Sequence, residues 1–117
     1  DLDLDITGDS NSTKTSQRNH YSYNTHNMDI DITGDSNTLF ANQAGQGTKS
    51  MTLSVTSDGN TMSHTQGGNG THTSTVSLGG TGPTNMNVNQ GGNTGQTYTL
   101  SNTCVNTNGC TVTVNQQ

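Results

Sequence analysis

The residues best suited to metal chemistry are the aspartates, because all eight acidic residues of the chain are Asp and several recur at matched spacing. The segment LDLDITGDSN at 2–11 recurs as MDIDITGDSN at 28–37, 26 residues later. If the copies stack, aligned carboxylates repel one another, and a Ca²⁺ ion with its preference for oxygen ligands would relieve that repulsion. The candidate ligands are Asp9, Asp35, Asp58, Asp29 and Asp31. The alternative interpretation is that these are solvated aspartates in ordinary turns; no other cofactor is indicated.

Redox chemistry is restricted to two cysteines, Cys104 and Cys110, which flank the sequence VNTNG. The dipeptide Asn108-Gly109 within it is a strong signal for a tight turn. We therefore predict a disulfide that closes this turn, which fits an oxidising compartment. The alternative is a pair of reduced thiols. A zinc site is not expected, because no histidine stands at metal-ligand spacing from either cysteine.

The histidines do not suggest a catalytic site. His64 falls at a position expected to face inward, where a packing or hydrogen-bonding role is expected, and His20, His26 and His72 fall in turns or linkers. No order of Ser, His and Asp suggests a triad. Paired catalytic acids require distinct environments, whereas these aspartates look equivalent. We therefore expect that the protein is not an enzyme.

The composition makes a conventional core impossible to fill. Only 23% of the 117 residues are hydrophobic, about half of the usual share in a globular domain. Polar compositions of this kind are usually disordered unless a periodic pattern reverses that expectation. The net charge of −5 excludes a basic nucleic-acid footprint, and no apolar run approaches membrane-spanning length. Because the chain begins at Asp1 without a signal peptide, we expect a processed form or a fragment.

A periodic repeat indicates that the chain is ordered despite this composition. Five glutamines recur at spacings of 26, 23, 24 and 26 residues, and each follows an alternating, mostly apolar pair. Six residues before the glutamine, the first three copies carry an asparagine of the same parity. The repeated amides are Asn11, Gln17, Asn37, Gln43, Asn60, Gln66, Gln90 and Gln116. Residues of one parity face one side of a strand, so these amides and the apolar pairs share a face.

Each copy also contains an earlier strand with alternating apolar residues. The strands are marked by Leu2, Leu4 and Ile6; Met28, Ile30 and Ile32; Met51, Leu53 and Val55; Val76 and Leu78; and Tyr98 and Leu100. The equivalent positions in the five copies are Leu4, Ile30, Leu53, Val76 and Tyr98, which are separated by 26, 23, 23 and 22 residues. Tyr98 is therefore expected to pair with Val76 in the stack. Two period-2 segments in each repeat indicate two half-buried strands. No helical periodicity is present.

These patterns predict an all-β fold: a single β-solenoid domain over residues 1–117, built from five strand–turn–strand rungs. The expected rungs are 1–27, 28–50, 51–73, 74–95 and 96–117. Stacked rungs about 4.8 Å apart would form two facing parallel sheets with cross-β stacking, spanning roughly 24 Å. The expected core includes Ile30, Ile32, Leu53 and Val55, with the asparagines and glutamines forming amide ladders along the axis.

The repeated amides resemble the curlin repeat family, the major subunits of bacterial curli fibres. The second half of that repeat, N-x5-Q, is matched by Asn11–Gln17, Asn37–Gln43 and Asn60–Gln66. In the fourth copy Thr84 or the offset Asn85 precedes Gln90, and in the fifth Cys110 precedes Gln116. The family's first glutamine, at the end of the first strand, has no match here. The resemblance implies secretion, self-assembly and a role in adhesion or biofilm matrix.

Two functions remain open from the sequence. The first is a structural subunit that adds head to tail into an extracellular, curli-like fibre, with copies of itself and a nucleator or surface anchor as partners. Its C-terminal segment TVTVNQQ has no charge or proline to block strand pairing. The second is a β-solenoid module of a virion fibre or surface adhesin that binds a receptor or glycan. Neither predicts nucleic-acid binding or membrane insertion, and they place the chain at the cell surface or the virion surface.

Overall fold

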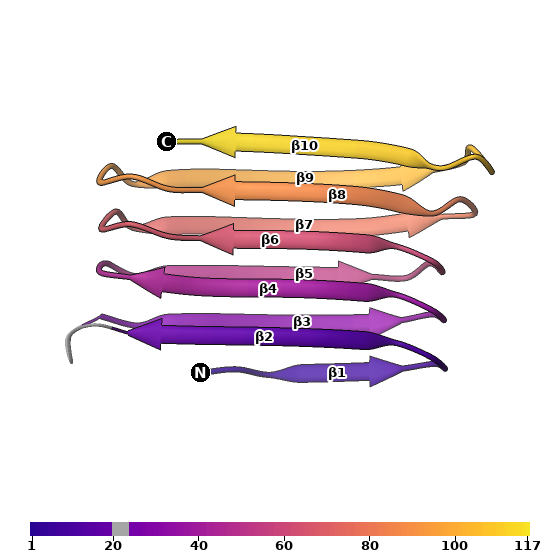
Figure 1. Cartoon of the computed structure of the whole chain (residues 1–117), viewed down its shortest axis with the longest axis horizontal. Coiled ribbons are helices and arrows are strands. Elements are labelled where there is room, and N and C mark those ends of the chain that lie inside the picture. Colours follow the sequence, from indigo (N-terminus) through magenta and orange to yellow (C-terminus); the bar gives the residue numbers. More distant parts are fainter. Residues whose placement is uncertain (20–23) are drawn as a thin grey trace.

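The computed structural model describes residues 1–19 and 24–117 and contains ten strands in that part of the chain (Figure 1). They are β1 (Leu4–Thr7), β2 (Ser12–Asn19), β3 (His26–Thr33), β4 (Thr38–Gly45), β5 (Lys49–Val55), β6 (Thr61–Gln66), β7 (His72–Gly80), β8 (Thr84–Gln90), β9 (Gln96–Cys104) and β10 (Cys110–Gln116). The segment His20 to Tyr23, with the His20 position considered above, lies outside the described residues. None of the described residues forms a helix long and apolar enough to cross a membrane.

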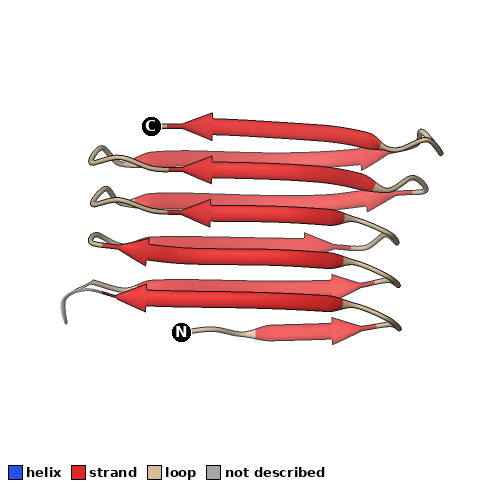
Figure 2. Ribbon diagram, in the orientation of Figure 1, coloured by secondary structure: helices blue, strands red, loops and turns tan. Residues whose placement is uncertain are grey.

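The strands form two sheets that face each other. One sheet has the order β1-β3-β5-β7-β9 and the other the order β2-β4-β6-β8-β10, and neighbours in both are parallel (Figure 2). Each rung thus contributes one strand to each sheet, which confirms the predicted β-solenoid. In Figure 1 the rungs stack along the 24 Å dimension of a body that measures 42 × 24 × 15 Å. That dimension agrees with the height expected for five rungs at strand spacing.

The register follows the sequence repeat with one correction. Leu53 pairs with Ile30 on one side and Val76 on the other, as expected. In the last rung Leu100, and not Tyr98, lies level with Val76, so the predicted register was wrong by two residues. The reason is that the turns 67–71 and 91–95 have equal length, so His72 pairs with Gln96 at the start of β7 and β9. A shift of two keeps every side chain on its expected face.

The rung boundaries also differ slightly from those expected. Strands β3, β5 and β7 begin at His26, Lys49 and His72, two residues before the rung starts expected at 28, 51 and 74. The extra residues at these strand starts are polar, so apolar alternation did not mark them. All three side chains nevertheless face the interior and are buried.

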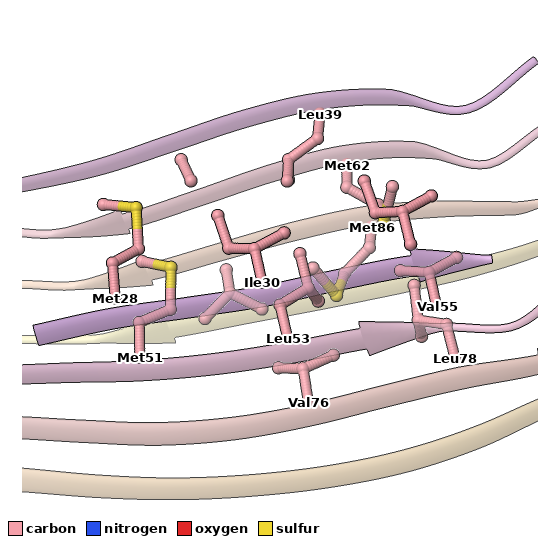
Figure 3. Packing of buried hydrophobic residues seen from close by; sticks show 13 residues of the cluster. Met28, Ile30, Leu39, Met51, Leu53, Val55, Met62, Val76, Leu78 and Met86 are labelled. Atoms are coloured by element: carbon pink, nitrogen blue, oxygen red, sulfur yellow. The ribbon is translucent and has the colours of Figure 1, made fainter. Parts of the chain in front are cut away.

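A thin core lies between the two sheets. Its buried side chains come from both sheets, and Figure 3 shows Ile30, Leu53 and Val76 of one sheet facing Leu39, Met62 and Met86 of the other. The full cluster is Met28, Ile30, Ile32, Leu39, Ala41, Met51, Leu53, Val55, Met62, Val76, Leu78, Met86 and Val88. Burial of each large aliphatic side chain contributes roughly 1.5–3 kcal/mol, which is how a chain poor in apolar residues can still fold.

Glycines allow the turns between rungs to stack as closely as the strands. Gly45 and Gly68 lie directly above one another with φ of +97° and +76°. A Cβ on either would lie 2.3 Å from a carbonyl oxygen of the following rung, on Gly68 and Gly92 respectively. Only a residue without a side chain fits this left-handed conformation and close approach.

Candidate functional site

A ladder of glutamine side chains runs along the stack from β2 to β10. Each side-chain amide except that of Gln116 donates from Nε2 to the Oε1 of the glutamine in the next rung toward the C-terminus. The distances are 3.0 Å for Gln17 to Gln43, and 2.9 Å for Gln43 to Gln66, Gln66 to Gln90 and Gln90 to Gln116. The predicted ladder is therefore present, and all its bonds point in one direction along the axis.

The same amides hold the two sheets together. Gln66 Nε2 also donates to the carbonyl of Ser50 at 2.8 Å, across the interior on the facing sheet. Gln90 makes the equivalent bond to the carbonyl of Thr73 at 3.3 Å. Because Gln43, Gln66 and Gln90 are fully buried, these donors have no access to water, and losing a partner would leave an unsatisfied group.

An asparagine ladder runs through the opposite turns in the first three rungs. Asn11 Oδ1 accepts the backbone N–H of Asn37 at 2.9 Å, and Asn37 Oδ1 accepts that of Asn60 at 3.0 Å. Asn60 Oδ1 then accepts the N–H of Thr84 at 2.8 Å, and the next residue in register is Cys110. This ladder ends before the last rung, and its donors point opposite to those of the glutamines.

The aspartates that the repeat suggested as calcium ligands lie in two different environments. Asp35 Oδ1 accepts the backbone N–H of Asp9 at 2.7 Å, and Asp58 Oδ1 accepts that of Asp35 at 2.8 Å. These carboxylates therefore act as acceptors for stacked turns, while Asp29 and Asp31 lie on the exposed outer face of β3. Within residues 1–19 and 24–117, no group of three or more His, Cys, Asp or Glu side chains could hold a metal ion.

A disulfide joins Cys104, at the end of β9, to Cys110, at the start of β10. It closes the turn 105–109, in which the Gly109 N–H donates to the carbonyl of Asn106 at 2.8 Å. Cys110 N–H donates to the carbonyl of Pro83 in the rung below at 2.9 Å. The disulfide thus fixes the turn between β9 and β10 at the C-terminal end of the stack.

Replacing both cysteines, as Cys104→Ala/Cys110→Ala, is expected to lower the free energy of unfolding by about 2 kcal/mol, the chain-entropy cost of a loop this short. Chemical denaturation of the oxidised wild type and the double variant measures the difference. A reducing agent should destabilise the wild type by a similar amount and leave the double variant unchanged. A wild type that is insensitive to reduction would contradict the stabilising role.

A buried basic column lies at the starts of β3, β5 and β7, and it was not predicted from the sequence. His26, Lys49, His72 and Gln96 lie in register at the first positions of β3, β5, β7 and β9. The expectation that His26 and His72 lie in turns or linkers was wrong, because both face the interior. Lys49 is fully buried, and its Nζ donates to backbone carbonyls of Gln46 and, at 2.6 Å, Gly70. The spacing of 23 residues from His26 to Lys49 and from Lys49 to His72 was the available signal.

Burial lowers the pKa values of the three titratable residues in this column. Loss of water lowers the pKa of Lys49. Burial also lowers the pKa of His26 and of His72, and the nearby charge of Lys49 acts in the same direction. Both imidazoles are therefore neutral near pH 7, and the Lys49 Nζ donates to the backbone carbonyls of Gln46, Gly47 and Gly70.

His64 links the two sheets in the middle of the core. Its Nε2 lies 2.9 Å from Ser74 Oγ, which also accepts a bond from Gln66 Nε2 at 3.3 Å. Both His64 and Ser74 are buried, so this Ser–His pair has no exposure to a substrate and acts as an interior polar bridge. Burial lowers the pKa of His64 to about 4.

These lowered pKa values predict acid sensitivity. Between pH 6.5 and the folded-state pKa values, the unfolded chain binds more protons than the folded chain, so stability falls as pH falls. For His64 alone, the loss between pH 7.5 and pH 5 is about 2 kcal/mol. Urea denaturation at these two pH values measures it. The variant His64→Gln keeps a partner for Ser74 and should lose that share of the pH dependence; an unchanged slope would contradict the assignment.

Both ends of the stack are open in the described part of the chain. At one end β1 and β2 each pair on one side only, and at the other end so do β9 and β10. Leu4 and Ile6 remain 40% and 38% exposed, whereas Ile30 and Ile32 in the next rung are 1% exposed. At the C-terminal end Tyr98, Leu100, Val112 and Val114 are only partly buried. Among the described residues, Gln17 Oε1 receives no donor, and Gln116 Nε2 reaches no acceptor.

Comparison of the chain with protein-family models, curated proteins and solved structures finds no match.

Proposed function

We propose that this protein is a structural subunit that adds head to tail to copies of itself, forming an extracellular fibre of the curli kind with a role in adhesion or biofilm matrix. The observation that carries the proposal is the directional glutamine ladder, which ends in an acceptor on Gln17 and a donor on Gln116. A second copy placed on the C-terminal end would continue this ladder by accepting the Gln116 amide at its own Gln17.

Apolar burial supports the same junction. The exposed Leu4 and Ile6 of one copy would cover the half-buried residues of β9 and β10 in the copy before it. Exposed strand edges template the addition of further strands. Because the two ends differ, the contact is heterologous, and repeated addition gives an open filament and not a closed dimer. The disulfide is consistent with an oxidising, extracellular setting.

Two variants of β10 test the junction. Val114 points inward at the exposed edge of the core, and its neighbour Thr113 points outward. Val114→Lys would place an unpaired charge in the junction and is expected to slow seeded growth by more than tenfold, because burying such a charge costs several kcal/mol. Thr113→Lys adds the same charge outside the junction and should elongate nearly as fast as the wild type.

The measurement is a thioflavin-T time course with and without seeds, read together with negative-stain images, after circular dichroism has shown that both variants fold. Micrometre filaments that seed growth of the wild type and Thr113→Lys support the proposal. A chain that stays monomeric or forms short closed oligomers at every concentration would overturn it. That result would favour the second function, a virion-fibre or adhesin module that binds a receptor or glycan.

A further inference from the structure

The outer face of the sheet β1-β3-β5-β7-β9 is acidic at one end only. Alternation along β3 turns Ile30 and Ile32 inward and its aspartates outward, and the register places Leu4 and Ile6 of β1 beside these isoleucines. The exposed aspartates are Asp3, Asp5, Asp29 and Asp31, which we call the acidic face. Asp5 lies directly beside Asp31 in the register, and like charges at that spacing are unfavourable. A partner of opposite charge would relieve this repulsion.

The outer face of the other sheet carries the opposite charge at the same end. Lys14 and Arg18 both point outward from β2 and are exposed, whereas the third basic residue, Lys49, is buried. Phe40 lies beside Lys14 in the register and remains 39% exposed. Together with Ser16, Asn42 and Ala44, these residues line a shallow hollow, which we call the basic hollow.

The two charged surfaces cannot neutralise each other within one molecule. They lie on opposite outer faces, with the core between them, and no ion pair forms between them in the described part of the chain. Both are confined to the first two rungs, while the outward positions of β6, β8 and β10 carry only Ser, Thr and Asn. The acidic face and the basic hollow therefore stand at the same height along the axis.

From this arrangement we infer that two copies associate side by side, with the acidic face of one copy against the basic hollow of the other. For copies that overlap over their full height, the charges meet only if both point in the same axial direction and stand level. An antiparallel pair would place the aspartates against the uncharged last rungs. The contact would also cover Phe40. Because each copy presents both surfaces, lateral addition can repeat and produces a layer.

This lateral contact does not depend on axial assembly, because a single molecule already presents both surfaces. In a fibre, the charged band would recur once for every subunit. Neighbouring filaments would then be held parallel and in subunit register, which gives bundling a defined polarity.

Salt and charge variants test the lateral contact. Attraction between exposed charges reaches about 30 Å at 0.01 M ionic strength and about 3 Å at 1 M. We expect lateral association at the low ionic strength and at least a tenfold weaker association at the high one. Lys14→Gln/Arg18→Gln should weaken it by at least tenfold at low salt. The control Thr107→Asp/Asn108→Asp makes the same change in net charge at the exposed disulfide turn and should associate like the wild type.

A charge exchange supplies the decisive comparison. Lys14→Asp/Arg18→Asp and Asp29→Lys/Asp31→Lys should each associate poorly alone and should pair when mixed. Bundles in negative-stain images provide the readout if filaments form, and sedimentation velocity of the soluble chain provides it if they do not. Single filaments, or monomers, that are unaffected by salt and by mixing would overturn the lateral contact. The presence or absence of filaments reports separately on axial assembly.

Discussion

Gly68→Ala is expected to lower the free energy of unfolding by on the order of 3–5 kcal/mol, the largest effect of any small substitution considered for this chain. The φ of +76° at Gly68 is unfavourable for alanine, and the new Cβ would lie 2.3 Å from the carbonyl oxygen of Gly92. Gly92 cannot withdraw easily, because that carbonyl accepts the N–H groups of Asn69 and Gly70 at 3.0 and 3.1 Å.

The preceding residue provides a matched control. A Cβ at Gly67 would meet no atom within 4 Å, and Gly67 does not have a positive φ. Gly67→Ala is therefore expected to be neutral or to stabilise the protein by about 0.4–1 kcal/mol, because alanine restricts the unfolded chain. Urea denaturation followed by far-ultraviolet circular dichroism, with the disulfide intact, measures both. Equal stability of the two variants would mean that the turns do not stack as described.

Gln66→Ala is expected to lower the free energy of unfolding by about 3–4 kcal/mol, because it breaks the amide ladder at its buried centre. The change leaves Gln90 Oε1 and the carbonyl of Ser50 without their donor, at about 1–3 kcal/mol for each buried unsatisfied group, and adds a cavity. The control is Gln46→Ala, the same substitution in the half-buried turn before β5, where only the backbone carbonyl of Gln46 makes a bond. Gln46→Ala is expected to change the free energy of unfolding by less than about 0.5 kcal/mol.

An isosteric variant separates the hydrogen bonds from the packing. Gln66→Glu keeps the shape but replaces the Nε2 donor, so that an oxygen would face the acceptors Gln90 Oε1 and Ser50 O. Its loss of stability should exceed that of Gln66→Ala at pH 7, where the new group is charged, and should shrink as the pH falls toward protonation of the carboxyl. Comparable denaturation midpoints for Gln66→Ala and Gln46→Ala would show that the ladder contributes little to stability.

Much of the fold could be predicted because like residues stack on like. Apolar alternation placed Ile30 level with Leu53, and the spacing of the glutamines placed Gln43 level with Gln66; the structure confirms both pairings. A shift of one residue would turn every core side chain outward, so the face of each strand was strongly specified. The register of β9 was less well specified, because β-strands shifted by two residues expose the same faces and Tyr98 is as plausible an inward residue as Leu100.

The sequence alone thus determined the five-rung solenoid, its two sheets and the amide ladder, because periodic patterns are local and repeat. Only the tertiary structure decided how the charged residues are used. It buried Lys49 beside two histidines, because backbone carbonyls of the stacked turns supply the solvation that water provides elsewhere. It also directed Asp35 and Asp58 to the N–H groups of neighbouring turns and placed the acidic and basic surfaces on opposite faces. The solvation of Lys49 and the bonds of Asp35 and Asp58 depend on where a backbone group of another rung lies, which no spacing along the chain specifies.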